Sequence, residues 1–289
     1  MPSAPGSGPR TPEYNDAMIS RIAMFVGTVA LLLSGGTLPP AALAEESTAR
    51  DLARAVHERP EGDDAVTRGI MTLTGGGRRE RVRESYEYRL EGEEPGASRN
   101  LIRFTSPRNI ADTAILIHNH PGGDVDQWLY LPAIQRERRI SSENRGGSFV
   151  QSELYFEDLE DREPHKDHHR ILGEDTYEGT PVTVLESIPV DSGNSVYSKR
   201  VSWIHEETRL PLRIDLYEGG DEPAKRLEVQ RIEDIQGYWT VTRSSMTHLA
   251  SGRTTILEVE DVTYNSGLPD ELFTLRGLSD PSLARPHRP

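Results

Sequence analysis

RVRESYEYRL, residues 81–90, alternates apolar or aromatic side chains with polar ones along nearly its whole length. Successive side chains of a β-strand point to opposite sides, so one face carries the apolar members Val82, Tyr86, Tyr88 and Leu90. The pattern predicts a half-buried strand. The same β-branched and aromatic composition recurs on both sides of it, and we expect further strands at residues 64–74, 100–106, 113–119, 126–131, 135–140, 167–174, 181–189, 196–205, 211–218, 224–235, 238–249 and 253–264.

Turn-forming residues separate these expected strands, as in Gly75-Gly76-Gly77 and Pro121-Gly122-Gly123. Short connections of this kind join neighbouring antiparallel strands, so the sequence predicts a meander. A sheet of so many strands accumulates twist and cannot stay flat. We therefore expect it to curl into a barrel or half-barrel, and the low aromatic content of 6% favours a partly hollow interior.

Three segments depart from the strand pattern. Residues 45–59 (EESTARDLARAVHER) have apolar positions at helical spacing and are followed by Pro60, which predicts one short amphipathic helix. Residues 141–161 interrupt the sheet and contain QSELYFEDLED, which is compatible with a turn or two of helix. A further helical turn is expected after Pro269, in PDELF.

The N-terminus carries the features of a secretory signal peptide. Residues 22–33 (IAMFVGTVALLL) are uncharged and apolar, follow Arg21, and precede the cleavage motif that ends at Ala44. The run is shorter than the roughly 20 residues of a membrane-spanning helix, so an uncleaved anchor is the weaker reading. We predict cleavage after Ala44 and a periplasmic mature protein. Translation from Met18 is the alternative to Met1.

Composition excludes several kinds of site and partner. The chain has no cysteine, which removes disulfides, thiol nucleophiles, thiolate metal sites and a lipid-anchoring cysteine. Its formal net charge of −14 argues against nucleic acid as a partner and allows only transient membrane contact. No linker divides the mature chain, so we expect residues 1–44 as extension and signal peptide, one domain at 45–278 and a disordered tail at 279–289.

Five blocks of sequence between residues 101 and 159 are specific enough to indicate a family. They are LIRFTSP (101–107), DQWLYLPA (126–133), RRIS (138–141), RGGSF (145–149) and EDL (157–159). Their order and spacing resemble the LolA-like outer-membrane lipoprotein-sorting proteins of bacterial periplasms. The resemblance extends more loosely over about residues 64–278. The chain departs from the usual pattern at Asp112 and at residues 151–156, which touch the expected lid.

The resemblance implies a mainly β fold, in which a large curved antiparallel sheet forms an incomplete β-barrel and a few short helices act as lid or plug. It implies a monomeric carrier that takes up acyl chains in an apolar cavity, without catalysis and without a cofactor. Candidate cavity or lid residues are Phe104, Trp128, Tyr130, Leu131, Ile140, Phe149, Leu154 and Phe156. Candidate gate or latch residues are Arg138, Arg139, Arg145, Gly146 and Gly147, where the glycines permit a hinge and arginine can latch to carboxylates.

Each of these signals has a plainer interpretation. Trp128 and Tyr130 fall on one face of a strand and Leu131 on the other, so one set can instead pack beneath a helix. The arginines at 136–139 suit an anionic headgroup or an acidic partner, but also a solvated strand edge. His168 and His169 point to opposite faces of a strand, which disfavours joint metal ligation, and no metal site is predicted.

Two functions remain open at this stage. The first is a periplasmic carrier that binds the acyl chains of lipoproteins or lipids and passes them towards an outer-membrane acceptor. The alternative is a non-catalytic adaptor that works with an inner-membrane export permease of the resistance-nodulation-division type. A secreted hydrolase finds no support, because no nucleophile is presented in a recognisable motif.

Overall fold

One antiparallel sheet dominates the computed structural model, which describes residues 40–77 and 79–288 and side chains from Glu46 onward. Within that part of the chain the sheet has thirteen strands, and β1 pairs with β13. The strands are β1 (Asp64–Gly75), β2 (Arg81–Glu91), β3 (Ser98–Ser106), β4 (Ala114–Asn119), β5 (Asp126–Leu131), β6 (Arg136–Ile140), β7 (Asp167–Tyr177), β8 (Thr180–Pro189), β9 (Lys199–His205), β10 (Pro211–Tyr217), β11 (Lys225–Ile235), β12 (Tyr238–His248) and β13 (Arg253–Tyr264). Each lies close to its predicted position.

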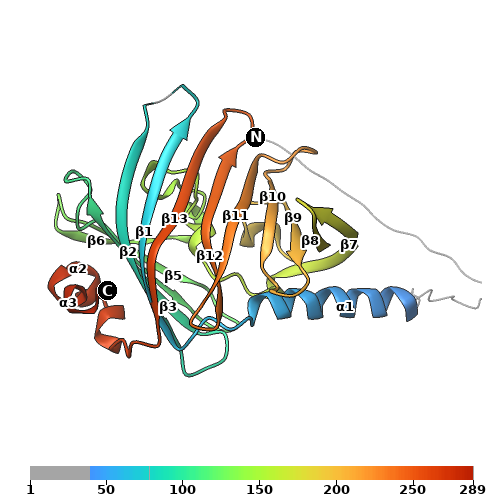
Figure 1. The fold of residues 1–289 in the computed structure, drawn as a ribbon, viewed down its shortest axis with the longest axis horizontal. Helices are drawn as coiled ribbons and strands as arrows, with labels where there is room; N and C mark the ends of the chain where they lie inside the picture. The colour runs from blue at the N-terminus through green and yellow to red at the C-terminus, as the bar shows by residue number, and fades with distance from the viewer. Residues whose placement is uncertain (1–39, 78, 289) are drawn as a thin grey trace, which may run out of the picture. The chain divides into compact units, whose positions relative to one another are not determined.

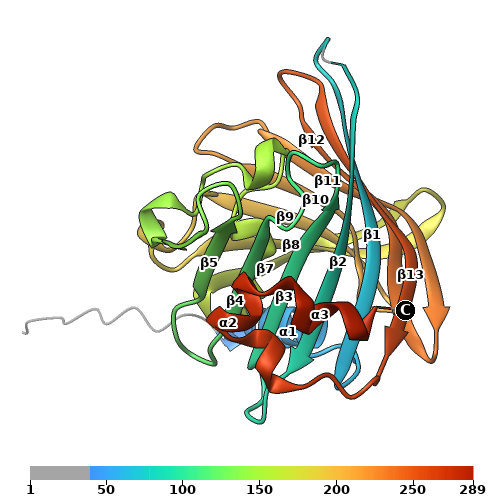
Figure 2. The same ribbon diagram turned by 90° about the vertical axis from the view of Figure 1, so that its left-hand side faces the viewer.

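The sheet curls around a concave inner face but does not close into a barrel (Figures 1 and 2). Its two edges are β6 and β7, which are consecutive in sequence yet do not pair. Residues 141–166 join them and contain four short 3-10 helices, η1 (Ser142–Asn144), η2 (Phe149–Gln151), η3 (Glu157–Leu159) and η4 (Pro164–Lys166). The predicted mainly β, incomplete barrel is confirmed, and we call residues 141–166 the insert.

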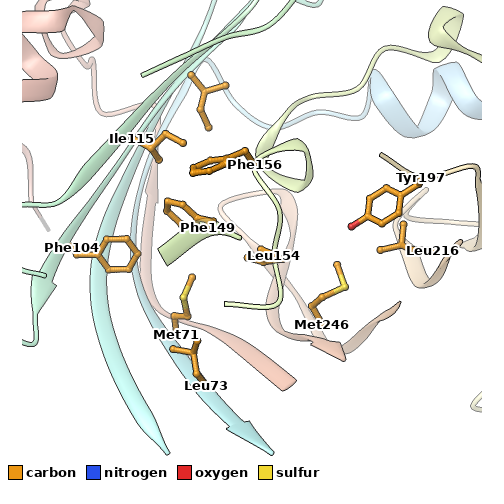
Figure 3. Close-up of a cluster of buried hydrophobic side chains, with 11 residues drawn as sticks. Met71, Leu73, Phe104, Ile115, Phe149, Leu154, Phe156, Tyr197, Leu216 and Met246 are labelled. Atoms are coloured by element: carbon orange, nitrogen blue, oxygen red, sulfur yellow. The ribbon is translucent and has the colours of Figure 1, made fainter. Parts of the chain in front are cut away.

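The insert fills part of the concave side with apolar side chains. Phe149 is 1% exposed and its ring lies 5.7 Å from that of Phe104 and 6.1 Å from that of Phe156, measured between centroids. Figure 3 shows these rings among side chains of the sheet. The cluster includes Met71, Leu73, Ile115, Ile117, Leu154, Tyr197, Leu216 and Met246. The insert therefore replaces the missing β6–β7 pairing with a plug.

Helix α1 (Pro40–His57) packs on the sheet near the β7 edge. Its buried residues Ala49 and Ala53 contact Leu185 and Ile204 of β8 and β9. Compared with the helix predicted at residues 45–59, the observed helix starts earlier and ends earlier. Most of the predicted signal peptide, residues 1–39, lies outside the described residues. Cleavage after Ala44 would retain both packing alanines.

The C-terminal segment is not a tail. The predicted disordered stretch at residues 279–289 contains α3 (Pro281–Ala284) and η7 (Arg285–His287), which follow η6 (Asp270–Phe273) and α2 (Leu275–Ser279). Leu278 and Ala284 are fully buried against the outer, convex face of the sheet at β2 to β4. The Tyr88 hydroxyl donates to the Ala284 carbonyl at 3.1 Å. That prediction was wrong because a Pro/Arg-rich composition hid the buried Ala284.

Arg103 fastens this segment to the convex face. Its side chain is fully buried, and Nη2 donates to the carbonyls of Gly277 and Leu278, both at 2.8 Å. The two carbonyls are the last acceptors of α2, where helical partners run out. Arginine therefore caps α2 and pins it to β3 at the same time.

We expect Arg103→Met to release the C-terminal segment, because two buried carbonyls would lose their donor. The loss should lower the free energy of unfolding by about 3 kcal/mol and expose residues 275–288 to protease. Urea unfolding and limited proteolysis followed by mass spectrometry measure both effects. Arg108→Met, at an exposed position without an ion pair in the described chain, is the control. An unchanged cleavage pattern in Arg103→Met would contradict the assignment.

Candidate ligand cavity

Two cavities lie on the concave face, on either side of residues 154–161 of the insert, which we call the strap. Lobe 1 has a volume of about 450 Å³ and lobe 2 about 300 Å³. Both volumes are in the range of small-molecule pockets. Leu154, Asp158, Glu160 and Asp161 line both lobes, so the strap is the wall between them.

The walls of the lobes are mainly apolar and come from separate parts of the sheet. Lobe 1 lies over β1 to β3, β12 and β13, and its apolar lining includes Met71, Ile102, Phe149, Leu257 and Val259. Lobe 2 lies between α1 and β7 to β12, and its apolar lining includes Val56, Leu185, Ile204, Ile214, Leu216, Leu227 and Met246. The curl of the sheet brings these distant positions around one hollow.

Lobe 1 also has a polar wall on β2 and β3, where Ser85, Glu87 and Asn100 face the cavity. Burial raises the pKa of Glu87, although Arg89 opposes the shift. The Asn100 Oδ1 atom is buried and has no hydrogen-bond partner in the described chain. Lobe 1 is therefore amphipathic, with an apolar majority.

Buried charges and hydrogen bonds hold the strap in place. Glu157, with a side chain 2% exposed, accepts from Arg200 and from the backbone N–H of Val196 at 2.7 Å. The Asp158 carboxylate accepts from the Tyr197 hydroxyl at 2.9 Å. Burial raises the pKa of Asp158, and a buried carboxylate needs such donors because its charge is poorly solvated.

Two further contacts tie the strap to β5 and to α1. Gln127 Nε2 donates to the Phe156 carbonyl at 2.9 Å and lies 3.4 Å from Glu160 Oε1. Burial, reinforced by the charge of Glu157, raises the pKa of Glu160 to about 7. His57 at the end of α1 lies 3.0 Å from Asp161, Nδ1 to Oδ1. That hydrogen bond raises the pKa of His57, against the opposing effect of burial.

A third cavity of about 630 Å³ lies at the unpaired edges, and we call it the seam cavity. It is lined by residues that follow β4, by β6 and by the insert, among them Arg139, Ile140 and Arg145. Glu160 lines this cavity as well as both lobes. It is the one described residue common to all three.

The predicted cavity residues divide between the two faces of the sheet. Phe149 and Leu154 line lobe 1, whereas Phe104 and Phe156 are buried in the core behind it. Ile140 lines the seam cavity. Leu131, the last residue of β5, lines none of the three cavities.

Trp128 and Tyr130 require a correction. Both pack on the convex face, in the cluster formed with Leu272, Phe273 and Leu278 of the C-terminal segment. The alternation of β5 places Gln127 and Leu129 on the concave side instead. The plainer interpretation, packing beneath a helix, is the one that the structure shows.

The predicted gate residues lie along the seam. Arg138 and Arg139 are exposed on the edge strand β6, and Arg139 forms an ion pair with Asp126. Arg145 Nε donates to the Ser142 carbonyl at 2.8 Å.

Gly146 and Gly147 are sites of close packing. A Cβ at Gly146 would lie 3.0 Å from Val196 Cγ1. A Cβ at Gly147 would lie 3.1 Å from the Phe156 ring, and the Gly147 carbonyl accepts from Phe156 N at 3.1 Å. A side chain at Gly146 would crowd Val196, and one at Gly147 would crowd Phe156 of the strap.

Sequence reasoning missed the strap carboxylates and His57. The only signal was an acidic run, EDLED at residues 157–161, inside a segment without strand pattern. Of the two histidines considered as metal ligands, His169 has a structural partner, since its Nδ1 lies 2.9 Å from Ser187 Oγ. Among the described residues no group of three or more potential metal ligands is found.

No helix in the described part of the chain is both long and apolar enough to span a membrane.

Comparison with known proteins identifies relatives that cover most of the described fold. A family model whose description reads "-like: Uncharacterized protein" matches residues 96–280. A crystal structure of an outer membrane lipoprotein-sorting protein domain from Vibrio parahaemolyticus is 32% identical, with 81% of this chain and 100% of that chain covered and a TM-score of 0.76. A DUF1329 family protein from Desulfovibrio piger is 29% identical, with 81% and 99% covered and the same TM-score of 0.76. No curated protein matches the chain.

The fold extends to more distant structures. A LolA superfamily protein from Nitrosomonas europaea is 20% identical, with 78% of this chain and 97% of that chain covered and a TM-score of 0.61. At that identity the likeness concerns the fold alone, and it agrees with the open curved sheet and its few short helices. From the family model and the relative from Vibrio we conclude that the chain belongs to the family of outer membrane lipoprotein-sorting proteins.

Proposed function

We propose that the protein is a periplasmic carrier that holds acyl chains of a lipoprotein or lipid in lobes 1 and 2 and carries them towards the outer membrane. The observation that carries the proposal is the pair of mainly apolar lobes beneath the strap. The similarity to the lipoprotein-sorting protein domain from Vibrio supports a lipoprotein-sorting role, and the predicted signal peptide supports export.

Burial of a hydrocarbon chain supplies the binding free energy. Each methylene transferred from water into an apolar cavity contributes about 0.8 kcal/mol. A chain that occupies either lobe would therefore be held firmly, and its release requires movement of a wall. The strap is the wall best suited to move, because side-chain contacts hold it rather than a strand ladder. Binding and release of this kind need no covalent chemistry.

The direct test is native mass spectrometry of protein purified without detergent, together with titration by a fluorescent fatty acid. We expect a mass increase from bound lipid and saturable fluorescence. An apo mass without uptake of the probe would overturn the proposal. If an inner-membrane permease also copurified from membranes, the adaptor function would become the better account.

Filling lobe 1 should block uptake. Ser85 faces lobe 1, whereas its neighbour Glu84 pairs with Arg68 and does not line the lobe. We expect Ser85→Trp to weaken fatty-acid binding by roughly tenfold or more, because exclusion of two methylenes at about 0.8 kcal/mol each has that effect. Glu84→Trp is the matched control on the same strand. Equal affinities in the two variants, measured by fluorescence titration, would place the ligand outside lobe 1.

The contact between His57 and Asp161 should make uptake depend on pH. Because the pKa of His57 is raised in the folded protein, its stabilisation of the closed strap is full below about pH 6.5 and disappears as pH rises through the raised pKa. Asp161, Glu163 and Glu58 favour the charged form of the ring. We expect uptake of the fluorescent fatty acid, measured by stopped flow, to be roughly twofold to fivefold faster above the raised pKa of His57 than below it. This is the size of effect that the loss of a partly exposed ion pair produces.

The variant His57→Gln separates this effect from other titrations. Glu160 ionises near the same pH, so some pH dependence is expected to remain in the variant. The part of the pH dependence that is lost in His57→Gln is due to the contact between His57 and Asp161. A pH profile identical to that of the unmodified protein would show that this contact does not restrain the strap.

A further inference from the structure

The seam cavity differs from the two lobes in the chemistry of its walls. Serine, asparagine and basic side chains replace the apolar lining, and they come from β6, the insert and the loops after β4 and β8. The cavity lies where the sheet fails to close, and Gln127 and Glu160 stand between it and the inner lobes. It is therefore an outer, polar compartment next to two inner, apolar ones.

Two cations in this cavity have no carboxylate partner. Arg145 makes one side-chain hydrogen bond, to the Ser142 carbonyl, and no ion pair is formed by Arg145 or Lys166 within the described chain. Both side chains line the cavity and are half-buried, and both act on Glu160 through their charge. A half-buried cation without a counterion is costly, and an anionic ligand would remove that cost.

The other charged groups at the seam are already paired or acidic. Arg139 pairs with Asp126, and His165 Nδ1 lies 2.9 Å from Glu163 Oε2. Asp124 lines the cavity as an opposing charge. The uncommitted positive charge is therefore confined to the inner side of the cavity, beside Glu160. Burial raises the pKa of Glu160 to about 7, which weakens its opposition to an anion near neutral pH.

We infer that the seam cavity binds the phosphate diester of a lipid headgroup, with Arg145 and Lys166 as its binding residues. The inference rests on the proposed function, because the hydrocarbon of the same ligand would occupy the lobes. Glu160, which lines all three cavities, marks the point where phosphate and acyl chains of one molecule meet. Arginine and lysine are the usual partners of phosphate oxygens.

The net charge of −14 does not oppose this site. Charges on the protein surface are screened over a Debye length of about 8 to 10 Å at physiological salt. An anion inside the cavity therefore responds mainly to the groups that line it. The acidic exterior would instead reduce unspecific adsorption of the protein to anionic membranes.

The test compares two fluorescent probes with identical acyl chains, phosphatidylglycerol and diacylglycerol, which differ in the phosphate headgroup. We expect the unmodified protein to bind phosphatidylglycerol more tightly. The double variant Arg145→Gln and Lys166→Gln should lose roughly tenfold in affinity for phosphatidylglycerol, as charged hydrogen bonds predict, and keep its affinity for diacylglycerol. The control double variant, Arg79→Gln and Arg108→Gln, removes two exposed cations that lie outside the three cavities.

Each outcome separates the inference from the proposed function. Unchanged phosphatidylglycerol binding in the Arg145 and Lys166 variant would overturn the headgroup site, and so would an equal loss in the control. Tight binding of inorganic phosphate alone, by calorimetry, would assign the cavity to a free anion and also overturn it. If the unmodified protein bound diacylglycerol and phosphatidylglycerol equally well, the headgroup site would be refuted and the carrier function would be retained. If neither probe bound the unmodified protein, the carrier function itself would fail.

Discussion

The failure of β6 and β7 to pair is the constraint on which the rest of the structure depends. Thirteen described strands follow one another around the sheet, and only this last ladder is missing. An open barrel must satisfy its exposed edges and fill its interior by other means. The insert does both at once, since it runs from one edge to the other and sends Phe149 into the core.

The same constraint explains why charges are buried in the strap. A chain segment without a strand ladder has backbone groups and side chains that need individual partners. Gln127 supplies one for the Phe156 carbonyl, and the Lys225 ammonium donates at 2.8 Å to the carbonyl of Glu153, the residue that precedes the strap. Burial lowers the pKa of Lys225 to about 8 and raises that of Glu160 to about 7, and the hydrogen bond with Asp161 raises that of His57, so all three contacts depend on pH. These contacts hold the strap at separate residues, so it does not pack along its whole length against the sheet. Cavities therefore remain on both sides of it.

Local patterns in the sequence were sufficient to predict where the strands lie, but not which face of the sheet points towards the cavities. Alternation and turn composition are properties of neighbouring residues, so the strand positions and the open curved sheet were predicted well. Trp128 was misplaced because both faces of β5 are apolar and both are covered, one by the insert and one by the C-terminal segment. The contacts of Glu157 and Arg200, or of His57 and Asp161, join residues that only the tertiary fold brings together. The ordered C-terminus was missed since its anchors, Leu278 and Ala284, are too few to form a periodic pattern.

The two covers of the sheet differ in the chemistry that attaches them. On the convex side, fully buried Arg103 caps α2, and its guanidinium keeps its charge across the physiological pH range. On the concave side, the attachments of the strap include the titratable groups His57 and Glu160, whose pKa values are both raised, that of Glu160 to about 7. A cover fixed by a permanent charge suits a structural wall, whereas the strap, although Arg200 pairs with its Glu157, also has attachments that respond to pH. The pH-sensitive attachments therefore lie on the same side of the sheet as the two lobes.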